Sequence, residues 1–326
     1  MVLPASYAEV SDAAEARLEI LKSRRDGLPQ RKKAAIDGVV HALNPAAMDP
    51  AIPRRRLLYL DLQGPEPLAA IVVGDLDTAT HVTWQLSGAG IRATTAMWGT
   101  VREAGQLLLE QRLVGERNPA VVAWLGYPAP GLLRAVFNRT ARTAVERLAH
   151  DLRRFARLRP DSPRTVIEAH SYGATLAAHA LERLAAGAGG AGGLRVHALA
   201  TTGSAGMPRR LARDPALMGL AGDAVFEGVA TSDSLARAGR LLSGRSLVPG
   251  RGFGVDGAPV LGLLPVTGHN TSRFVPGAHR SSYGYRDPGT QSLRNLALVT
   301  TGRGPVGPQP AGRGGAPRFA GRRLWP

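Results

Sequence analysis

The sequence predicts an α/β fold built on one mostly parallel sheet with helices on both faces. From about residue 81 onward, short runs rich in β-branched residues alternate with longer runs of helical spacing. Strands that alternate with helices are joined by crossovers and lie parallel inside a covered sheet. Before that point, strand-like runs follow one another through short connections containing Gly, Pro and Asp, which predicts an antiparallel leading edge. The 326 residues with 44% hydrophobic content can bury a substantial core.

The start of the chain predicts helices rather than strands. Two amphipathic runs are separated by a Gly/Pro break at 27–29, and Ser6 with Glu9 forms a capping box ahead of the first run. We therefore expect an N-terminal helical segment at 1–50, followed by the main domain at 51–302.

The elements of the main domain follow from apolar periodicity. The expected strands lie at 56–63, 68–75, 81–88, 120–128, 165–169, 194–202 and 224–232. The expected helices lie at 95–114, 140–159, 174–186 and 290–300. A glycine-rich stretch at 187–193 follows a helix and not a strand, so it does not fit a dinucleotide-binding fingerprint. The Arg-, Gly- and Pro-rich end at 303–326 is too polar to build a core and is expected to be a disordered tail.

Composition excludes several classes of function. The formal charge of +16 raises the question of an anionic partner, but nearly all of it is arginine in a chain rich in Ala, Gly and Pro, as high-G+C coding produces. Without zinc-finger spacing, a leucine zipper or aromatic-interleaved basic motifs, the sequence argues against a nucleic-acid partner. The lack of cysteine excludes disulfides, thiolate catalysis and cysteine–zinc sites. No signal peptide or transmembrane run is visible, so a cytoplasmic location is expected.

Ser171 is the strongest candidate for chemistry. It lies between the expected strand at 165–169 and the expected helix at 174–186. A serine at this place can simply cap a helix. A nucleophile elbow, however, is a turn so tight that the positions two before and two after the serine must be small. Here they are Ala169 and Gly173, which a capping serine would not need, so we expect Ser171 to be a nucleophile.

A serine hydroxyl needs a base to take its proton and an acid to orient that base. When the serine lies on such an elbow, the acid and then the histidine follow it along the chain. Asp233, just after the expected strand at 224–232, is the expected acid, with Asp256 in reserve. Only His269 and His279 come later. His279, in a loop shortly before the last helix, is the preferred base, and His269 is the alternative.

The reaction also needs donors for the oxyanion of its tetrahedral intermediate. Backbone N–H groups that are already in place serve this purpose, and losing one donor costs on the order of 3 kcal/mol. The amide of Tyr172, directly after the serine, is one expected donor. The second is the amide of Ala89, in a glycine-containing loop after the expected strand at 81–88.

Five blocks of the chain together resemble a bacterial α/β-hydrolase family of unknown function. Within residues 55–302 they read GDLDTATHVTWQLSGAG, VVAWLGYPAP, VIEAHSYGAT, VATSDS and AHRSSYGYRDPGTQSLRNLALVTTG. The resemblance implies an α/β-hydrolase fold with a serine nucleophile at Ser171, an acid at Asp233 and a histidine at His279.

The chain departs from that family's pattern at three positions. Ala169 stands where the elbow usually begins with glycine, Ala89 where the oxyanion loop usually has threonine, and Pro128 where an acid is common. The leading hypothesis is a serine hydrolase acting on a carboxylic ester or related small acyl compound, without metal or organic cofactor. Acyl transfer to an acceptor other than water would use the same residues. The alternative is a non-catalytic binding or scaffold protein on the same fold.

Overall fold

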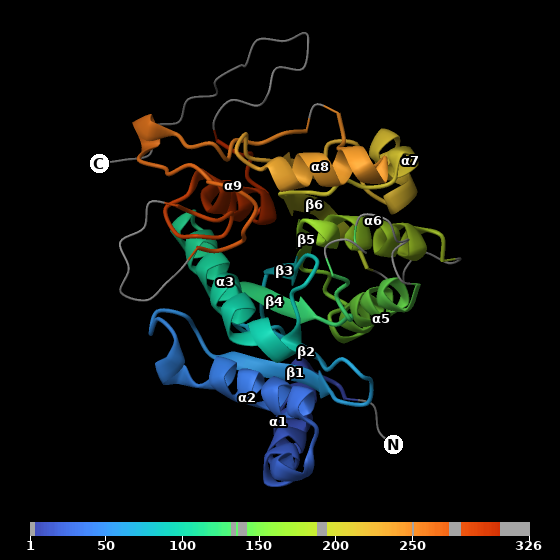
Figure 1. The fold of residues 1–326 in the computed structure, drawn as a ribbon, viewed down its shortest axis with the longest axis vertical. Helices are drawn as coiled ribbons and strands as arrows, with labels where there is room; N and C mark the ends of the chain where they lie inside the picture. The colour runs from blue at the N-terminus through green and yellow to red at the C-terminus, as the bar shows by residue number, and fades with distance from the viewer. Residues whose placement is uncertain are drawn as a thin grey trace.

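In the computed structural model, which describes residues 4–131, 135, 142–187, 194–249, 251–273 and 282–306, seven strands form one sheet (Figure 1). Their order is β1-β2-β4-β3-β5-β6-β7. The strands are β1 (Arg55–Asp61), β2 (Leu68–Val73), β3 (His81–Leu86), β4 (Pro119–Leu125), β5 (Arg164–His170), β6 (Val196–Thr202) and β7 (Val225–Gly228). His279 and residues 307–326 of the expected tail lie outside the described residues.

The predicted fold class is confirmed, because five neighbouring strands from β4 to β7 are parallel. The antiparallel edge contains β1 and β2, which pair with each other, and β2 then pairs antiparallel with β4. Although β3 follows β2 along the chain, it belongs to the parallel part of the sheet, between β4 and β5.

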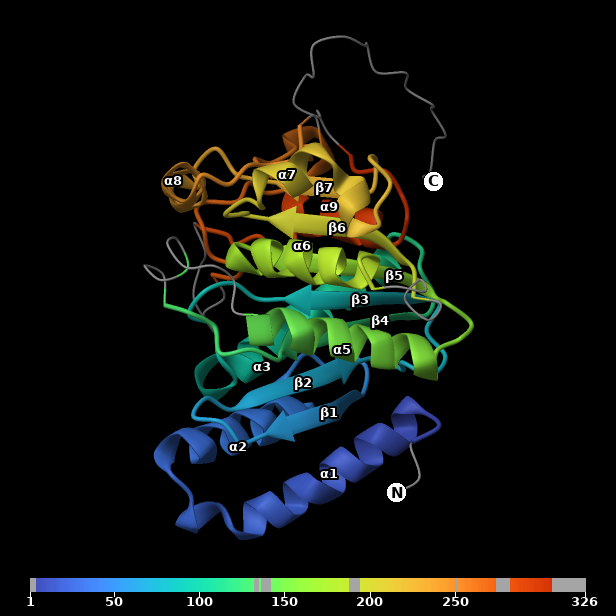
Figure 2. The same cartoon turned by 90° about the vertical axis from the view of Figure 1, so that its right-hand side faces the viewer.

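Helices cover both faces of this sheet (Figure 2). One face carries α5 (Arg142–Leu158) and α6 (Tyr172–Ala185), and the other carries α2 (Gln30–Leu43), α3 (Ala93–Leu113) and α9 (Gln291–Thr300). Alternate residues of β4 show why: Val122 and Trp124 pack toward α5 and α6, whereas Val121 and Ala123 pack toward α3 and α9. Strands buried on both faces read as continuous apolar runs, as the sequence of β4 does.

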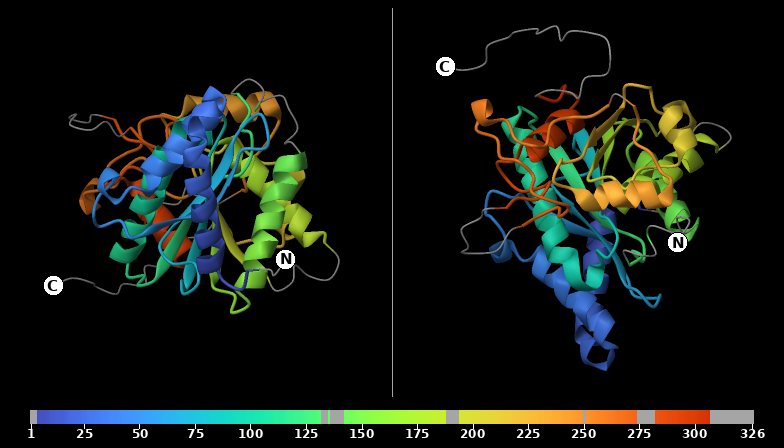
Figure 3. Two further views of the ribbon diagram at one scale, coloured as in Figure 1. Left: turned by 90° about the horizontal axis from the view of Figure 1, so that it is seen from below. Right: turned by 45° about the horizontal axis from the view of Figure 1, so that its top comes forward.

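The N-terminal helices pack on the sheet. Helix α1 (Tyr7–Ser23) lies beside β1, and α2 packs on α3. Seen from below, α1 and α2 lie in front of the sheet, with α3 to one side and α5 to the other (Figure 3, left). Ser6 caps α1 by accepting a bond from Glu9 N, and the Asp77 carboxylate accepts the amides of Tyr7 and Ala8 at 2.7 Å each. These bonds satisfy free donors of the first turn and fix α1 to the turn after β2.

Two further helices, α7 (Arg209–Arg213) and α8 (Ser234–Ser243), follow β6 and β7. In the right-hand view of Figure 3, α8 lies across the front of the molecule. Within the described part of the chain, the helices are too short or too polar to pass through a bilayer. Because parallel strands end at a common edge, the loops after β3, β5, β6 and β7 meet there, and this edge positions the site.

Candidate active site

Ser171 occupies a strained turn between β5 and α6. It has φ 55° and ψ −124°, a conformation that favours glycine, and its N–H donates to Thr202 O at 3.0 Å. Such a backbone costs on the order of 1–3 kcal/mol and persists only where its surroundings enforce it. The predicted strand, turn and helix are therefore all present, and the serine lies at the apex of the turn.

The small residues around Ser171 are required by contacts with the loop after β3. A Cβ atom added at Gly173 would lie 2.9 Å from the Ser87 carbonyl oxygen, and one at Gly88 would lie 2.8 Å from Ser171 Cβ. From the sequence, we attributed the small residues at 169 and 173 to the tightness of the turn itself. Instead, the nearest atoms to position 173 belong to that neighbouring loop. The tight packing still needs a small residue, but it joins two loops.

Ser171, His269 and Asp233 form one continuous hydrogen-bonded chain. His269 Nε2 lies 2.9 Å from Ser171 Oγ, and His269 Nδ1 lies 2.9 Å from Asp233 Oδ2 and 3.0 Å from Oδ1. Asp233 is buried and also caps α8 by accepting a bond from Ala236 N at 2.9 Å. Asp233 therefore begins a helix and contacts a histidine at the same time.

The structure brings together two of the three residues singled out from the sequence, Ser171 and Asp233. The histidine beside them is His269, which was the alternative, while the preferred His279 lies outside the described residues. No local pattern distinguishes His269, because it follows Gly268 in a segment that reads only as a turn.

Tyr285, which sequence reasoning missed, supports the acid. Its hydroxyl donates to Asp233 Oδ2 at 2.8 Å and accepts a bond from Ala230 N at 2.9 Å. Burial alone would raise the pKa of Asp233, but the bonds from His269, Ala236 N and Tyr285 hold that pKa below its ordinary value. Burial and the nearby Asp233 raise the pKa of Tyr285, so its phenol remains a proton donor.

A buried ionic cluster anchors the loop that carries His269. The fully buried Arg286 donates to Glu168 Oε2 at 2.6 Å and to Glu103 Oε2 at 2.9 Å. Thr271, two residues after His269, donates to Glu103 Oε1 at 2.7 Å. Glu168 lies on β5 just before the elbow, so the cluster connects that strand, α3 and the histidine loop.

Two amides beside Ser171 are available to a ligand. Within the part of the chain that the structure describes, the N–H groups of Ala89 and Tyr172 have no protein acceptor, whereas the Gly90 N–H donates to Pro130 O at 2.9 Å. The Tyr127 hydroxyl donates to Ser87 O at 2.9 Å and steadies this loop. Ala89 and Tyr172 line the same small pocket as Ser171 and His269.

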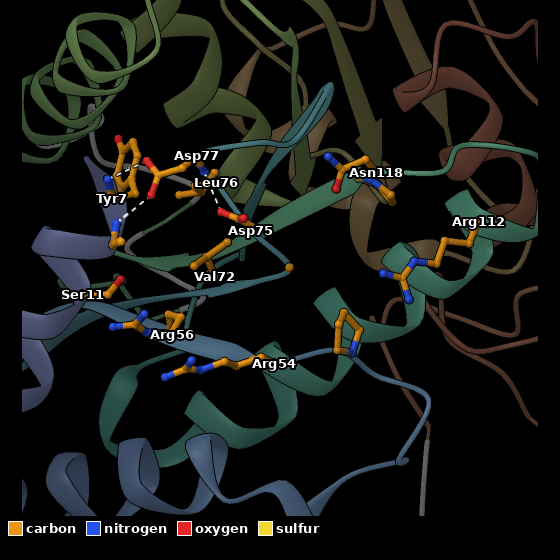
Figure 4. Close-up of a pocket in the computed structure, with 14 residues that line it drawn as sticks. Tyr7, Ser11, Arg54, Arg56, Val72, Asp75, Leu76, Asp77, Arg112 and Asn118 are labelled. Carbon is orange, nitrogen blue, oxygen red and sulfur yellow. Dashed lines mark hydrogen bonds between the residues drawn. The ribbon is translucent and has the colours of Figure 1, made fainter. Parts of the chain in front are cut away.

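A second hollow lies away from these residues, between α1 and the turn after β2 (Figure 4). Two of its acids are engaged in local hydrogen bonds. Asp77 caps α1, and Asp75 accepts bonds from Asp77 N and from the Thr78 hydroxyl. None of the described residues that line it is a histidine. Among the described residues, no group of three His, Cys, Asp or Glu side chains could hold a metal ion. The arrangement suited to acid–base chemistry is therefore the one at Ser171.

A family model described as alpha/beta hydrolase matches residues 64–243, more than half of the chain. The chain belongs to the alpha/beta hydrolase family. This membership confirms the resemblance to α/β-hydrolases that the sequence showed, and with it the predicted class of enzyme. No curated protein matches the chain.

Solved structures similar to this alpha/beta hydrolase include three esterases. An arylesterase has 13% identity over 88% of this chain and 97% of its own, with a TM-score of 0.44. A fungal esterase from Rhizomucor miehei has 13% identity over 92% and 96%, with a TM-score of 0.42. A hyperthermophilic esterase from the archaeon Pyrobaculum calidifontis has 14% identity over 86% and 97%, with a TM-score of 0.42.

Proposed function

We propose that this alpha/beta hydrolase is a serine hydrolase that cleaves a carboxylic ester or related small acyl compound. Ser171 is the nucleophile, His269 the base and Asp233 the acid that orients it. The observation that carries the proposal is the path from Ser171 Oγ through both ring nitrogens of His269 to Asp233, with 2.9 Å at each step. His269 takes the role that the sequence analysis gave to His279, because its ring lies between the other two groups.

The first half of the reaction forms an acyl-enzyme. Ser171 Oγ attacks the carbonyl carbon of the ester while His269 Nε2 takes the hydroxyl proton. Asp233 accepts the bond from His269 Nδ1–H and stabilises the imidazolium. The amides of Tyr172 and Ala89 donate to the oxyanion. The intermediate then collapses, and the alcohol leaves with the proton from His269 Nε2.

The second half restores the enzyme. Water attacks the acyl carbon while His269 Nε2 takes one of its protons, and the same two amides hold the second oxyanion. When this intermediate collapses, Ser171 Oγ leaves and recovers its proton from His269. The carboxylic acid is released, and all the protons are balanced without a cofactor.

A fluorophosphonate probe tests this assignment directly, because it reacts only with a serine that a base has activated. We expect one adduct, located at Ser171 by mass spectrometry and absent from Ser171→Ala. His269→Ala should reduce the labelling rate by at least about a hundredfold. His279→Ala should label at nearly the rate of the parent protein.

The reverse result for the two histidine variants would restore His279 as the base. A protein that is folded but unlabelled, with melting behaviour like that of Ser171→Ala, would favour the binding or scaffold role instead. Hydrolysis is distinguished from acyl transfer by adding a competing alcohol and measuring the share of acyl product that it captures.

A further inference from the structure

Among the described residues, the lining of the pocket beside Ser171 includes one arginine, Arg245. The other described residues of the lining are mostly small or apolar, among them Ala89, Ala205 and Leu235, and none of them carries a carboxylate. A compound that enters this pocket therefore meets apolar walls and a guanidinium.

Arg245 is held in place at both ends of its side chain. At its base, a Cβ atom at Gly206 would lie 2.9 Å from Arg245 Cβ, so the stem is packed against the backbone of that residue. At its tip, the guanidinium donates to Ala135 O at 3.1 Å, and its carbon lies 5.6 Å from the centre of the Tyr172 ring. Arg245 and Ser171 line the same small pocket, so these contacts hold the cation on the wall of the space that the nucleophile faces.

The surroundings of Arg245 favour an anion. Residues 234–255 contain four arginines and no aspartate or glutamate, so this stretch supplies no carboxylate of its own. Arg245 is half-buried, and burial lowers its pKa. A guanidinium stays protonated under such conditions. A partly desolvated cation beside apolar walls gains free energy from an anionic ligand more readily than an exposed one does.

We propose that Arg245 selects substrates that carry a carboxylate or phosphate within a few ångströms of the scissile ester. The inference rests on the proposed function, since it names the substrate class of the same site. A guanidinium has five N–H donors in a planar fork that holds a carboxylate or phosphate through two parallel bonds. A charge-assisted bond to such an anion is roughly twice as strong as a bond to a neutral carbonyl, so the anion competes well with the acceptors that Arg245 already has, among them Ala135 O.

The test compares kcat/KM for anionic and neutral esters of matched shape, using the full-length protein. For an anion on the acyl side, mono-p-nitrophenyl glutarate is compared with p-nitrophenyl valerate. For an anion on the alcohol side, 4-acetoxybenzoate is compared with its methyl ester, and 4-acetoxyphenyl phosphate supplies the phosphate. We expect kcat/KM for at least one anionic ester to exceed that of its neutral counterpart by about tenfold or more, which is the effect of one charged hydrogen-bonded pair. In Arg245→Met this ratio of anionic to neutral kcat/KM should fall to near one.

Two further variants separate contact from general charge. Arg245→Lys keeps the charge without the fork and should keep part of the ratio. Arg213→Met removes the same charge from an exposed position on α7 and should leave the ratio unchanged.

Two results would overturn the role of Arg245 and leave the proposed function standing. In one, the parent protein hydrolyses anionic and neutral esters with similar kcat/KM. In the other, the preference for an anionic ester remains in Arg245→Met. If no ester is hydrolysed and Ser171 is not labelled by the fluorophosphonate, the proposed function fails, and this inference fails with it.

Discussion

The phenolic oxygen of Tyr285 lies 2.8 Å from Asp233 Oδ2, at the buried end of the hydrogen-bonded chain that runs through His269 to Ser171. The other carboxylate oxygen accepts the Ala236 amide, and both oxygens lie within 3.0 Å of His269 Nδ1. Asp233 is thus fixed by a tyrosine, a helix N-terminus and a histidine. A carboxylate held in this way stays ionised and cannot rotate, which keeps the imidazole aimed at Ser171.

Tyr285→Phe should lower kcat by about tenfold, because it removes a hydrogen bond to a buried charge worth about 1.5–3 kcal/mol and frees the carboxylate to rotate. KM for a p-nitrophenyl ester should change little, since Tyr285 is absent from the pocket lining. Steady-state kinetics checks both parameters.

The matched control is Tyr59→Phe. Its hydroxyl also donates to a carboxylate, Asp151 Oδ2 at 3.3 Å, but on β1 at the far edge of the sheet. That variant should keep kcat. Equal losses of kcat in the two variants, or a Tyr285→Phe effect confined to KM, would show that Tyr285 does not act through Asp233.

Local signals were enough to single out Ser171 and Asp233, which the structure places together, but not the histidine that lies between them. An elbow consists of a strand, a turn and a helix that are contiguous in sequence, and an acid after a strand is recognised in the same way. His269 reaches Ser171 because its loop is folded back by backbone bonds from distant residues, from Tyr285 N to Asn270 O at 3.0 Å and from Arg286 N to Thr271 O at 2.7 Å. Spacing alone favoured His279, which is nearer to the last helix.

The order of the strands in the sheet could not be predicted from local patterns either. The seven strands could be predicted, because each has its own apolar run. Their pairing depends on contacts between distant residues: β4 pairs with both β2 and β3, and so separates two strands that are consecutive in sequence. The buried Arg286 and Tyr285 could not be predicted either, since polar residues in a Gly- and Pro-containing stretch look like a surface turn until their buried partners are known.

Gly88→Ala should reduce both activity and stability. The new methyl group would lie 2.8 Å from Ser171 Cβ and 3.2 Å from His170 O, neither of which can move without disturbing the elbow. Overpacking of this kind costs about 1–3 kcal/mol, and a shift of the nucleophile by about 1 Å costs about a hundredfold in kcat/KM. Urea unfolding and ester hydrolysis measure the two effects.

Gly99→Ala is the companion variant for this test. Position 99 lies within α3, and an added Cβ meets no atom within 4 Å. Alanine is the better helix former by about 1 kcal/mol, so this change should stabilise the protein and leave hydrolysis unchanged. If Gly88→Ala behaved in the same way, the loop after β3 would be looser than the contacts imply.

Ser171→Gly should unfold at higher urea concentration than Ser171→Ala. Both variants lack the nucleophile, but only glycine adopts φ 55° and ψ −124° without strain. Glycine should relieve about 1–3 kcal/mol of backbone strain in the folded protein. Its greater freedom in the unfolded chain offsets up to about 1 kcal/mol of this, so the free energy of unfolding should be higher by about 1 kcal/mol. Equal unfolding midpoints for the two variants would mean that the elbow stores no strain.

Glu227→Gln should change how stability depends on pH. Glu227 lies on β7, where its carboxylate accepts a bond from Val248 N at 2.6 Å. Burial raises its pKa from 4.5 to about 8, against the opposing effect of that bond. Between these two values the unfolded chain releases a proton that the folded protein keeps. The free energy of unfolding contributed by this residue therefore falls as pH rises through the window, and changes little outside it.

Glutamine does not titrate, so the variant escapes this loss. Relative to the parent protein it should gain stability on the order of 3–5 kcal/mol between pH 5 and pH 8, from a shift of about 3.5 units in the pKa of Glu227. Urea unfolding at both pH values measures the gain. Glu19→Gln, on the exposed side of α1, serves as the control. The prediction would be wrong if the stability of the parent and that of Glu227→Gln changed in parallel over this pH range. Glu227 would then have the same pKa in the folded and unfolded protein, which would require its carboxyl group on β7 to be exposed to water.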